Sequence, residues 1–327
     1  MVNTGARPLT VTIIGNTSWG NTLGNLLANN GATVKLWTRY ETEAEELNRE
    51  EKGYFFTSSM AEALEGADLV VWAVPSQRMR WNVIQAKDYL TDSMVLVSAA
   101  KGLEAQSGMR MSEVIAEEIA PPLRDQICVL SGPNLAKEIA QGLPAASVIA
   151  ARNPVLAEKL RGLLESPNFF LFSSDDVVGV ELSGAFKNII ALGAGMIDGL
   201  GLGDNAKSAF MTLGWAELVS LGVSLGAKEN TFYGLAGLGD LIATCSSQLS
   251  RNHYVGFQLA KGRNINDITA SMPHVAEGIT TTLAAQRLAQ RQRLNLSIVN
   301  AIYEILYRGV PPNEIMTRFK ELVTSHR

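Results

Sequence analysis

The sequence predicts two domains: an N-terminal α/β domain with a Rossmann-type, doubly wound sheet, and an all-α C-terminal domain. Three observations support this fold class. At 327 residues, the chain is long for one domain. In its first half, short apolar segments alternate with helical segments, which is the pattern of a doubly wound sheet. After about Ser173 the apolar residues recur at helical spacing and convincing strands are absent.

Several of the predicted strands are rich in Val and Ile and apolar throughout, as expected of parallel strands with helices on both faces. The predicted strands are Thr10–Ile14, Thr33–Trp37, Leu69–Val74, Met94–Ala99, Ile127–Leu130, Ala146–Ala150 and Phe169–Phe172. Helices are predicted between them, including Trp19–Asn30 and Glu41–Glu50. Gly31 follows the first helix, where a glycine commonly caps the C-terminus.

The second half is expected to contain only helices. Apolar residues at helical spacing predict them over Val180–Ile197, Asn205–Leu225, Asn252–Lys261, Ile279–Gln290 and Val299–Tyr307. We therefore place the domain boundary near Ser174. Residues 1–174 are expected to bind a dinucleotide, and residues 175–327 to form a helical substrate-binding and catalytic domain.

The composition and the net charge argue against several classes of function. The residues are 46% hydrophobic and 18% charged, and the net charge of −4 provides no basic surface for nucleic acid. No apolar run reaches about 18 residues, so no membrane span is expected. The N-terminus lacks the layout of a signal peptide, and two distant cysteines fit a cytoplasmic protein without a disulfide. The three histidines do not cluster with cysteine or acidic residues, so no metal site is expected.

The stretch GNTSWG follows the first predicted strand and resembles a phosphate-binding turn. Gly15 and Gly20 match the first and third glycines of the G-x-G-x-x-G pattern, which permit the tight turn and close helix packing. Thr17 replaces the middle glycine and adds a side chain where backbone normally approaches the pyrophosphate. The helix N-terminus still favours an anion, with Ser18 and Trp19 beside it. The segment is either a cofactor site or a plain strand–turn–helix with incidental glycines.

A second indication lies beyond the strand Thr33–Trp37. Arg39 stands near the position where an acidic residue would bind the ribose 2′-hydroxyl of NAD, and an arginine there suits the 2′-phosphate of NADP. Glu41 lies two residues further on, so NAD remains an alternative cofactor. The spacing alone fits a solvated arginine at the end of a strand equally well.

Six further segments carry a specific resemblance. They are VPSQ (Val74–Gln77), SAAKGLE (Ser98–Glu104), SGPNLAKEI (Ser131–Ile139), VELSGAFKNIIALGAGMIDGLGLGDNAK (Val180–Lys207), AGLGDLIATCSSQLSRN (Ala236–Asn252) and HVAEGITT (His274–Thr281). In this order and spacing, the chain resembles the bacterial type of NAD(P)-dependent glycerol-3-phosphate dehydrogenase over nearly its whole length. The resemblance implies reversible reduction of dihydroxyacetone phosphate to sn-glycerol 3-phosphate with NADP or NAD, for phospholipid synthesis. It also implies a homodimer.

The resemblance assigns the catalytic lysine to Lys187, on the helix Val180–Ile197. An ammonium there would polarise the ketone and protonate the developing alkoxide. Spacing alone fits a surface lysine with its charge in solvent. Lys101, otherwise an ordinary loop lysine, is implied to bind both substrate and cofactor. Asp240 is implied to bind the substrate hydroxyls and to hold Lys187, and it also suits a helix N-cap.

The remaining positions are likewise implied by the resemblance. Ser250, Arg251 and Asn252 are expected to grip the substrate phosphate, because arginine binds phosphate with a two-pronged fork. Further substrate contacts are assigned to Gly132, Asn134, Asn188 and Thr244. The cofactor contacts are Gly15, Thr17, Ser18, Trp19, Gly20, Arg39, Tyr40, Lys101, Ala136, Arg251, Val275 and Glu277.

Three positions depart from the family pattern. Thr17 replaces a glycine, Asn134 stands where Ser or Thr is common, and Leu213 stands where bacterial members often carry arginine. These changes affect the expected cofactor affinity or kinetics more than the reaction. Two rival functions are a related 3-hydroxy acid dehydrogenase, which would need a carboxylate-binding site, and a nucleotide-binding sensor that has lost catalysis.

Overall fold

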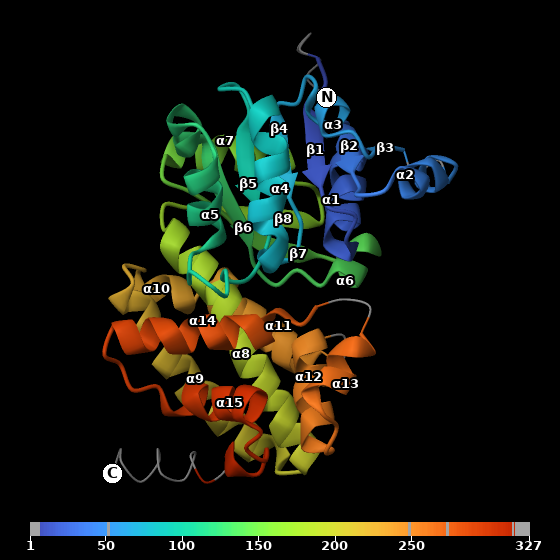
Figure 1. Cartoon of the computed structure of the whole chain (residues 1–327). Coiled ribbons are helices and arrows are strands. Elements are labelled where there is room, and N and C mark those ends of the chain that lie inside the picture. Colours follow the sequence, from blue (N-terminus) through green and yellow to red (C-terminus); the bar gives the residue numbers. More distant parts are fainter. Residues whose placement is uncertain (1–6, 51–52, 248–249, 273–274, 316, 318–327) are drawn as a thin grey trace.

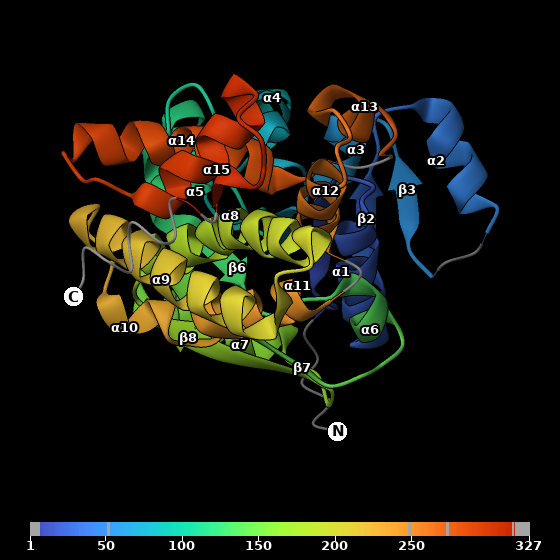
Figure 2. The same cartoon turned by 90° about the horizontal axis from the view of Figure 1, so that it is seen from below.

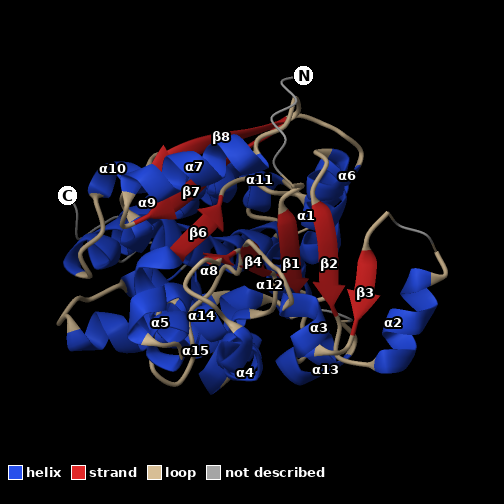
Figure 3. Cartoon of the chain, turned by 90° about the horizontal axis from the view of Figure 1, so that it is seen from above, coloured by secondary structure: helices blue, strands red, loops and turns tan. Residues whose placement is uncertain are grey.

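The N-terminal half forms one eight-stranded sheet with helices on both faces (Figures 1 and 3). A computed structural model of the chain describes residues 7–50, 53–247, 250–272, 275–315 and 317. The strand order is β3-β2-β1-β4-β5-β6-β7-β8, and all neighbours are parallel except β6 and β7. The strands are β1 (Thr10–Ile14), β2 (Thr33–Trp37), β3 (Phe55–Thr57), β4 (Leu69–Trp72), β5 (Val95–Ser98), β6 (Ile127–Ser131), β7 (Ala145–Ala151) and β8 (Phe169–Ser174).

All seven predicted strands are present, with ends that differ by up to two residues. The eighth, β3, was not predicted. It is a three-residue edge strand paired only with β2, so it is too short to show an apolar pattern. The predicted fold class, a doubly wound Rossmann-type domain followed by a helical domain, is confirmed.

The helices of the first domain divide between the two faces of the sheet. They are α1 (Ser18–Asn29), α2 (Glu41–Asn48), α3 (Met60–Leu64), α4 (Met79–Ala86), α5 (Met111–Glu118), α6 (Ala136–Ala140) and α7 (Pro154–Leu164). Apolar residues of α1 and α7 pack in one cluster with β1, β2, β5 and β8. Those of α3, α4 and α5 pack in a second cluster on the opposite face. The central strands β1, β4, β5 and β6 are therefore buried on both sides, which explains their largely apolar sequences, whereas β8 at the edge alternates between buried and exposed residues.

Beyond β8, the described residues form helices only. These are α8 (Val177–Leu200), α9 (Gly203–Ser224), α10 (Glu229–Phe232), α11 (Asp240–Ser246), α12 (Arg251–Ala260), α13 (Ile265–Ala270), α14 (Glu277–Arg291) and α15 (Ser297–Arg308). α8 lies at the centre, against α9, α11, α12 and α14 (Figure 2). By length and composition it could cross a membrane, with a mean hydropathy of 1.4 in its most apolar window, but 94% of that window is buried. Such burial indicates a core helix.

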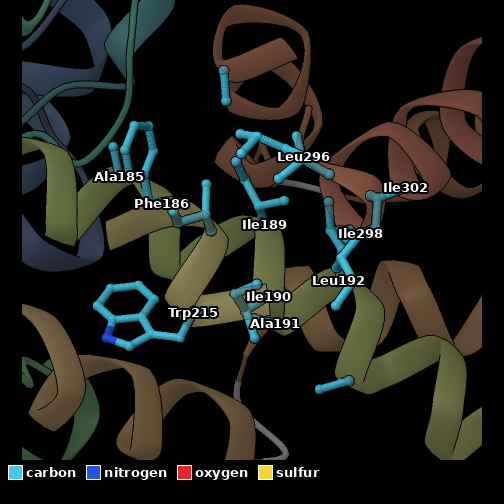
Figure 4. Close-up of a cluster of buried hydrophobic side chains, with 14 of the residues drawn as sticks. Ala185, Phe186, Ile189, Ile190, Ala191, Leu192, Trp215, Leu296, Ile298 and Ile302 are labelled. Atoms are coloured by element: carbon cyan, nitrogen blue, oxygen red, sulfur yellow. The ribbon is translucent and has the colours of Figure 1, made fainter. Parts of the chain in front are cut away.

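Small residues let two helices approach α8 closely. A Cβ added at Gly195 of α8 would lie 2.0 Å from the carbonyl oxygen of His253 in α12, and one at Gly256 would lie 1.9 Å from that of Leu192. A Cβ at Gly278 of α14 would meet the Asn188 carbonyl at 2.5 Å. Backbone therefore packs on backbone at these crossings, while larger side chains such as those around Phe186 fill the surrounding core (Figure 4).

A buried ion pair joins the two domains. Glu181 of α8 accepts a charged hydrogen bond from Arg110 Nη1 at 2.6 Å, together with bonds from the backbone N–H of Ser112 at 2.7 Å and its hydroxyl at 2.5 Å. Arg110 and Ser112 lie at the start of α5. Burial raises the pKa of Glu181, although Arg110 and Ser112 favour its charged form. The carboxylate thus fixes α8 against the sheet domain, six residues before Lys187.

We predict that Glu181→Ala lowers the free energy of unfolding by about 3 kcal/mol, because it leaves the Arg110 charge buried with its strongest partner removed. Glu113→Ala is the matched control, since Glu113 pairs with the same arginine but its side chain is 42% exposed. The control should cost less than about 1 kcal/mol. Urea unfolding measures both, and equal costs would contradict the role given to Glu181.

Candidate active site

The glycine-containing turn lies between β1 and α1, at the carboxyl edge of the sheet where ligands of such folds bind. Gly15 has φ +119, and a Cβ there would lie 2.8 Å from the Ala73 carbonyl oxygen. A Cβ at Gly20 would lie 2.3 Å from the Gly15 carbonyl oxygen. Both glycines are therefore required by the turn itself, and the first residue of α1, Ser18, is exposed.

Thr17 is the N-cap of α1. Its hydroxyl accepts a hydrogen bond from the Gly20 N–H at 3.0 Å and donates one to the Ala73 carbonyl at 2.7 Å. The hydroxyl thus satisfies one of the free N–H groups of the first turn and ties that turn to the residue after β4. The next aromatic residue, Trp19, packs against the sheet core, and its indole N–H is buried without a partner. The expectation that Thr17 holds a cofactor less closely stays a prediction.

The centre of the site is an aspartate between two lysines. Asp240 Oδ1 lies 3.1 Å from Lys187 Nζ, and Asp240 Oδ2 lies 2.7 Å from Lys101 Nζ. The three side chains come from α11, α8 and the end of β5 and are only 4%, 9% and 17% exposed. A single turn of π-helix, Leu235–Gly239, precedes Asp240, which is the first residue of α11 and not its N-cap. The group carries one net positive charge, which suits an anionic ligand.

Burial lowers the pKa of Lys101 to about 8, and the positive charge of Lys187 acts in the same direction. The Asp240 carboxylate opposes both effects. Lys101 Nζ also donates to the Gly132 carbonyl at 2.6 Å, so two of its three N–H groups are used within the protein. The third remains for a ligand.

Lys187 is held in a similar way. Its Nζ donates to Thr244 Oγ1 at 2.7 Å, and Thr244 in turn donates to Asp240 Oδ1 at 3.2 Å. One N–H is donated to Thr244 and the charge is paired with Asp240, so at least one N–H is left for a ligand. The buried ammonium is therefore held in place before any ligand binds. The alternative of a surface lysine with its charge in solvent is wrong, because Lys187 is 7% exposed.

Two asparagines join the helices around the lysines. Asn188 Nδ2 reaches the Lys101 carbonyl at 3.5 Å, and its Oδ1 accepts from Asn252 Nδ2 at 2.8 Å. Asn252 Oδ1 accepts from the Gly278 N–H at 2.9 Å. This chain of bonds links the segment after β5 to α8, α12 and α14. Asn252 therefore connects helices as well as standing at the predicted phosphate site, a structural role that the sequence did not indicate.

The predicted phosphate group lies at the N-terminus of α12. Ser250 is the N-cap, and its hydroxyl accepts from the His253 N–H at 3.2 Å. Arg251 is exposed, and one of its N–H groups donates to the Val275 carbonyl at 3.1 Å, while the Val275 side chain is also exposed. An exposed arginine beside a capped helix N-terminus is a suitable anion-binding arrangement.

The segment after β6 faces the same region. Gly132 adopts φ +150, and a Cβ there would meet the Ser147 backbone at 2.8 Å. Asn134 Oδ1 accepts from the Ser147 hydroxyl at 2.6 Å, whereas its Nδ2 is buried without a partner. Ala136 begins α6, and its carbonyl accepts from Thr22 of α1 at 3.3 Å. The structure therefore brings this segment to both α1 and Lys101.

The structure gives Ser76 a contact that the sequence did not indicate. The Ser76 N–H donates to Glu277 Oε1 at 2.9 Å, and its hydroxyl donates to Glu277 Oε2. A Cβ at Gly102 would lie 2.5 Å from Ser76 Oγ, so the three segments are closely packed. Burial raises the pKa of Glu277, and both Ser76 bonds oppose the rise. Ser76 belongs to the VPSQ segment noted above, but nothing in the sequence assigned it a partner 201 residues away.

A doubly wound sheet with a glycine turn, joined to a helical domain that supplies a buried lysine, defines a two-domain nicotinamide-dependent dehydrogenase. Residues 10–157 match the family model of the NAD-dependent glycerol-3-phosphate dehydrogenase N-terminus, and residues 176–317 match that of its C-terminus. The chain belongs to the NAD-dependent glycerol-3-phosphate dehydrogenase family and is an oxidoreductase. This confirms the predicted family, enzyme class and NAD(P) cofactor.

Individual relatives support the same family assignment. A glycerol-3-phosphate dehydrogenase [NAD(P)+] of Dehalococcoides mccartyi is 50% identical over 97% of this chain and 92% of its own length. One from Carboxydothermus hydrogenoformans is 40% identical over 95% of this chain and 97% of its own length. The crystal structure of the Coxiella burnetii enzyme superposes with a TM-score of 0.89 at 30% identity, covering 97% and 99% of the two chains.

We predict that Thr17→Val lowers the free energy of unfolding by about 1 kcal/mol, because valine keeps the shape but cannot cap α1. Thr33→Val is the control, since Thr33 is exposed at the start of β2 and its change should stay within about 0.5 kcal/mol. Chemical denaturation measures the difference. A Thr17→Val variant as stable as its control would show that the cap contributes nothing.

Proposed function

We propose that the chain reduces dihydroxyacetone phosphate to sn-glycerol 3-phosphate, and catalyses the reverse reaction, with Lys187 as the proton donor. The observation that carries this proposal is the buried Lys187–Asp240–Lys101 group, in which each ammonium keeps one N–H for a ligand. A carbonyl oxygen that gains negative charge needs such fixed donors in a site shielded from water.

The residues around the glycine turn suit a dinucleotide. Gly15 and Gly20 permit the tight turn that leads into α1, and the N-terminus of α1 favours the pyrophosphate. The buried, unpartnered Nδ2 of Asn134, in the segment between β6 and α6, supports a polar ligand there. When bound, the nicotinamide supplies or accepts the hydride. Glu277, Val275 and Lys101 are the proposed contacts from the other side.

The protein handles the proton. Lys187, positioned by Asp240 and Thr244, donates the N–H directed at the C2 oxygen of the substrate, and the N–H bond breaks as the new O–H bond forms. In the reverse direction, the neutral amine accepts that proton. Lys101 holds its positive charge below about pH 8 and stabilises the oxygen as negative charge develops on it.

The substrate phosphate is proposed to lie on Arg251 and the N-terminus of α12, with Asn252 and Ser250 beside it. Arginine and helix N–H groups bind both kinds of anion, and a phosphate dianion gains more from them than a carboxylate because it carries twice the charge. This arrangement argues against the 3-hydroxy acid alternative. Gly132, Asn134 and Asn188 are proposed as additional substrate contacts.

We also propose a metabolic role, a location, an oligomeric state and a domain division. The product supplies the backbone of phospholipids, and we place the enzyme in the cytoplasm as a homodimer. We place the division between its dinucleotide-binding and substrate-binding domains between residues 174 and 175, since β8 ends at Ser174 and α8 begins at Val177.

The decisive experiment compares initial rates of dihydroxyacetone phosphate reduction by wild type, Lys187→Met and the exposed control Lys159→Met. Lys187→Met should lower kcat by about 10²–10⁴-fold, because a positioned acid contributes that much. The control should match wild type. Near-wild-type turnover by Lys187→Met would contradict its role. Wild type that binds NADPH but turns over neither this substrate nor oxo acids would favour the sensor.

A further inference from the structure

An arginine without a polar partner stands beyond the end of β2, between two exposed aromatic rings. The Arg39 guanidinium lies 5.4 Å from the centre of the Tyr40 ring and 5.6 Å from that of Trp81. Tyr40 is 57% exposed and Trp81 is 43% exposed. Within the part of the chain that the structure describes, Arg39 makes no hydrogen bond or ion pair. Its five N–H donors are free to bind an anion.

Trp81 comes from a different part of the sheet domain. It lies in the first turn of α4, which follows β4, and its ring packs at 6.1 Å against Trp37 at the end of β2. Trp37 is itself buried and donates its indole N–H to the Ser58 carbonyl at 2.9 Å. The buried Trp37 ring therefore supports Trp81, whose ring centre also lies 5.6 Å from the Arg39 guanidinium.

The acidic groups nearby are already bound within the protein. Glu43 accepts from Asn16 Nδ2 at 2.7 Å and from the Thr38 hydroxyl. Glu41 accepts from the Ser58 hydroxyl at 3.2 Å. A ribose 2′-hydroxyl would have to compete for these carboxylates, whereas a 2′-phosphate finds Arg39 available.

We propose that Trp81 is a specificity-determining residue, which together with Tyr40 holds Arg39 in position to bind the 2′-phosphate of NADP(H) in preference to the 2′-hydroxyl of NAD(H). This inference rests on the proposed function, which assigns Arg39 and Tyr40 to the cofactor. Trp81 is a new member of that site. A guanidinium restrained over aromatic faces loses less freedom when it binds phosphate, so its affinity rises.

The test is the ratio of the dissociation constants for NADH and NADPH, measured by calorimetry on the full chain. Trp81→Ala should weaken NADPH binding about threefold to fivefold, the range of an exposed cation–π contact, while NADH binding changes less than about twofold. Trp81→Phe keeps an aromatic face and should restore most of the preference. Ile84→Ala removes another exposed apolar side chain of α4 and serves as the matched control.

The outcomes separate the two proposals. Equal weakening of both cofactors in Trp81→Ala, or no change in either, would overturn the role of Trp81. Wild type that prefers NADH would overturn it as well. Wild type that binds neither cofactor would instead contradict the proposed function.

Discussion

One carboxylate holds the site together. Two lysine ammonium groups buried side by side repel each other, and an opposite charge between them stabilises the pair. Asp240 gives one oxygen to each lysine, at 3.1 Å and 2.7 Å. The interaction also fixes where the two domains meet, since Lys101 follows a strand of the sheet whereas Lys187 and Asp240 belong to helices.

The surrounding structure holds the side chains of Lys101, Lys187 and Asp240 in their relative positions. Glycines at the crossings of α8 with α12 and α14 allow the backbones to touch, which brings Asn252 within 2.8 Å of Asn188. Glu181 ties α8 to α5, and Glu277 ties α14 to the segment after β4. Each tie crosses from the helical domain to the sheet domain. The precision of the site therefore depends on these contacts within the protein as well as on the groups that bind a ligand.

The sequence predicted the fold well because buried parallel strands and amphipathic helices have distinct apolar patterns. β3 was not predicted because a three-residue edge strand is too short to show an apolar pattern. The candidate site residues depended on family resemblance, since a buried lysine such as Lys187 looks like a surface lysine until its neighbours are known. The Thr17 cap, the Ser76–Glu277 contact and the support of Arg39 by Trp81 were not predicted. Each depends on segments brought together by the tertiary structure.

The most direct test of the central claim is the pKa of Lys101 in wild type and in Asp240→Asn. It can be followed by NMR on protein with ¹³C-labelled lysine, with the signal assigned through Lys101→Arg. Wild type should titrate at about pH 8, and Asp240→Asn should titrate lower, because the carboxylate that favours the ammonium is gone. The exposed control Asp267→Asn should match wild type. An unchanged or higher pKa in Asp240→Asn would contradict the account.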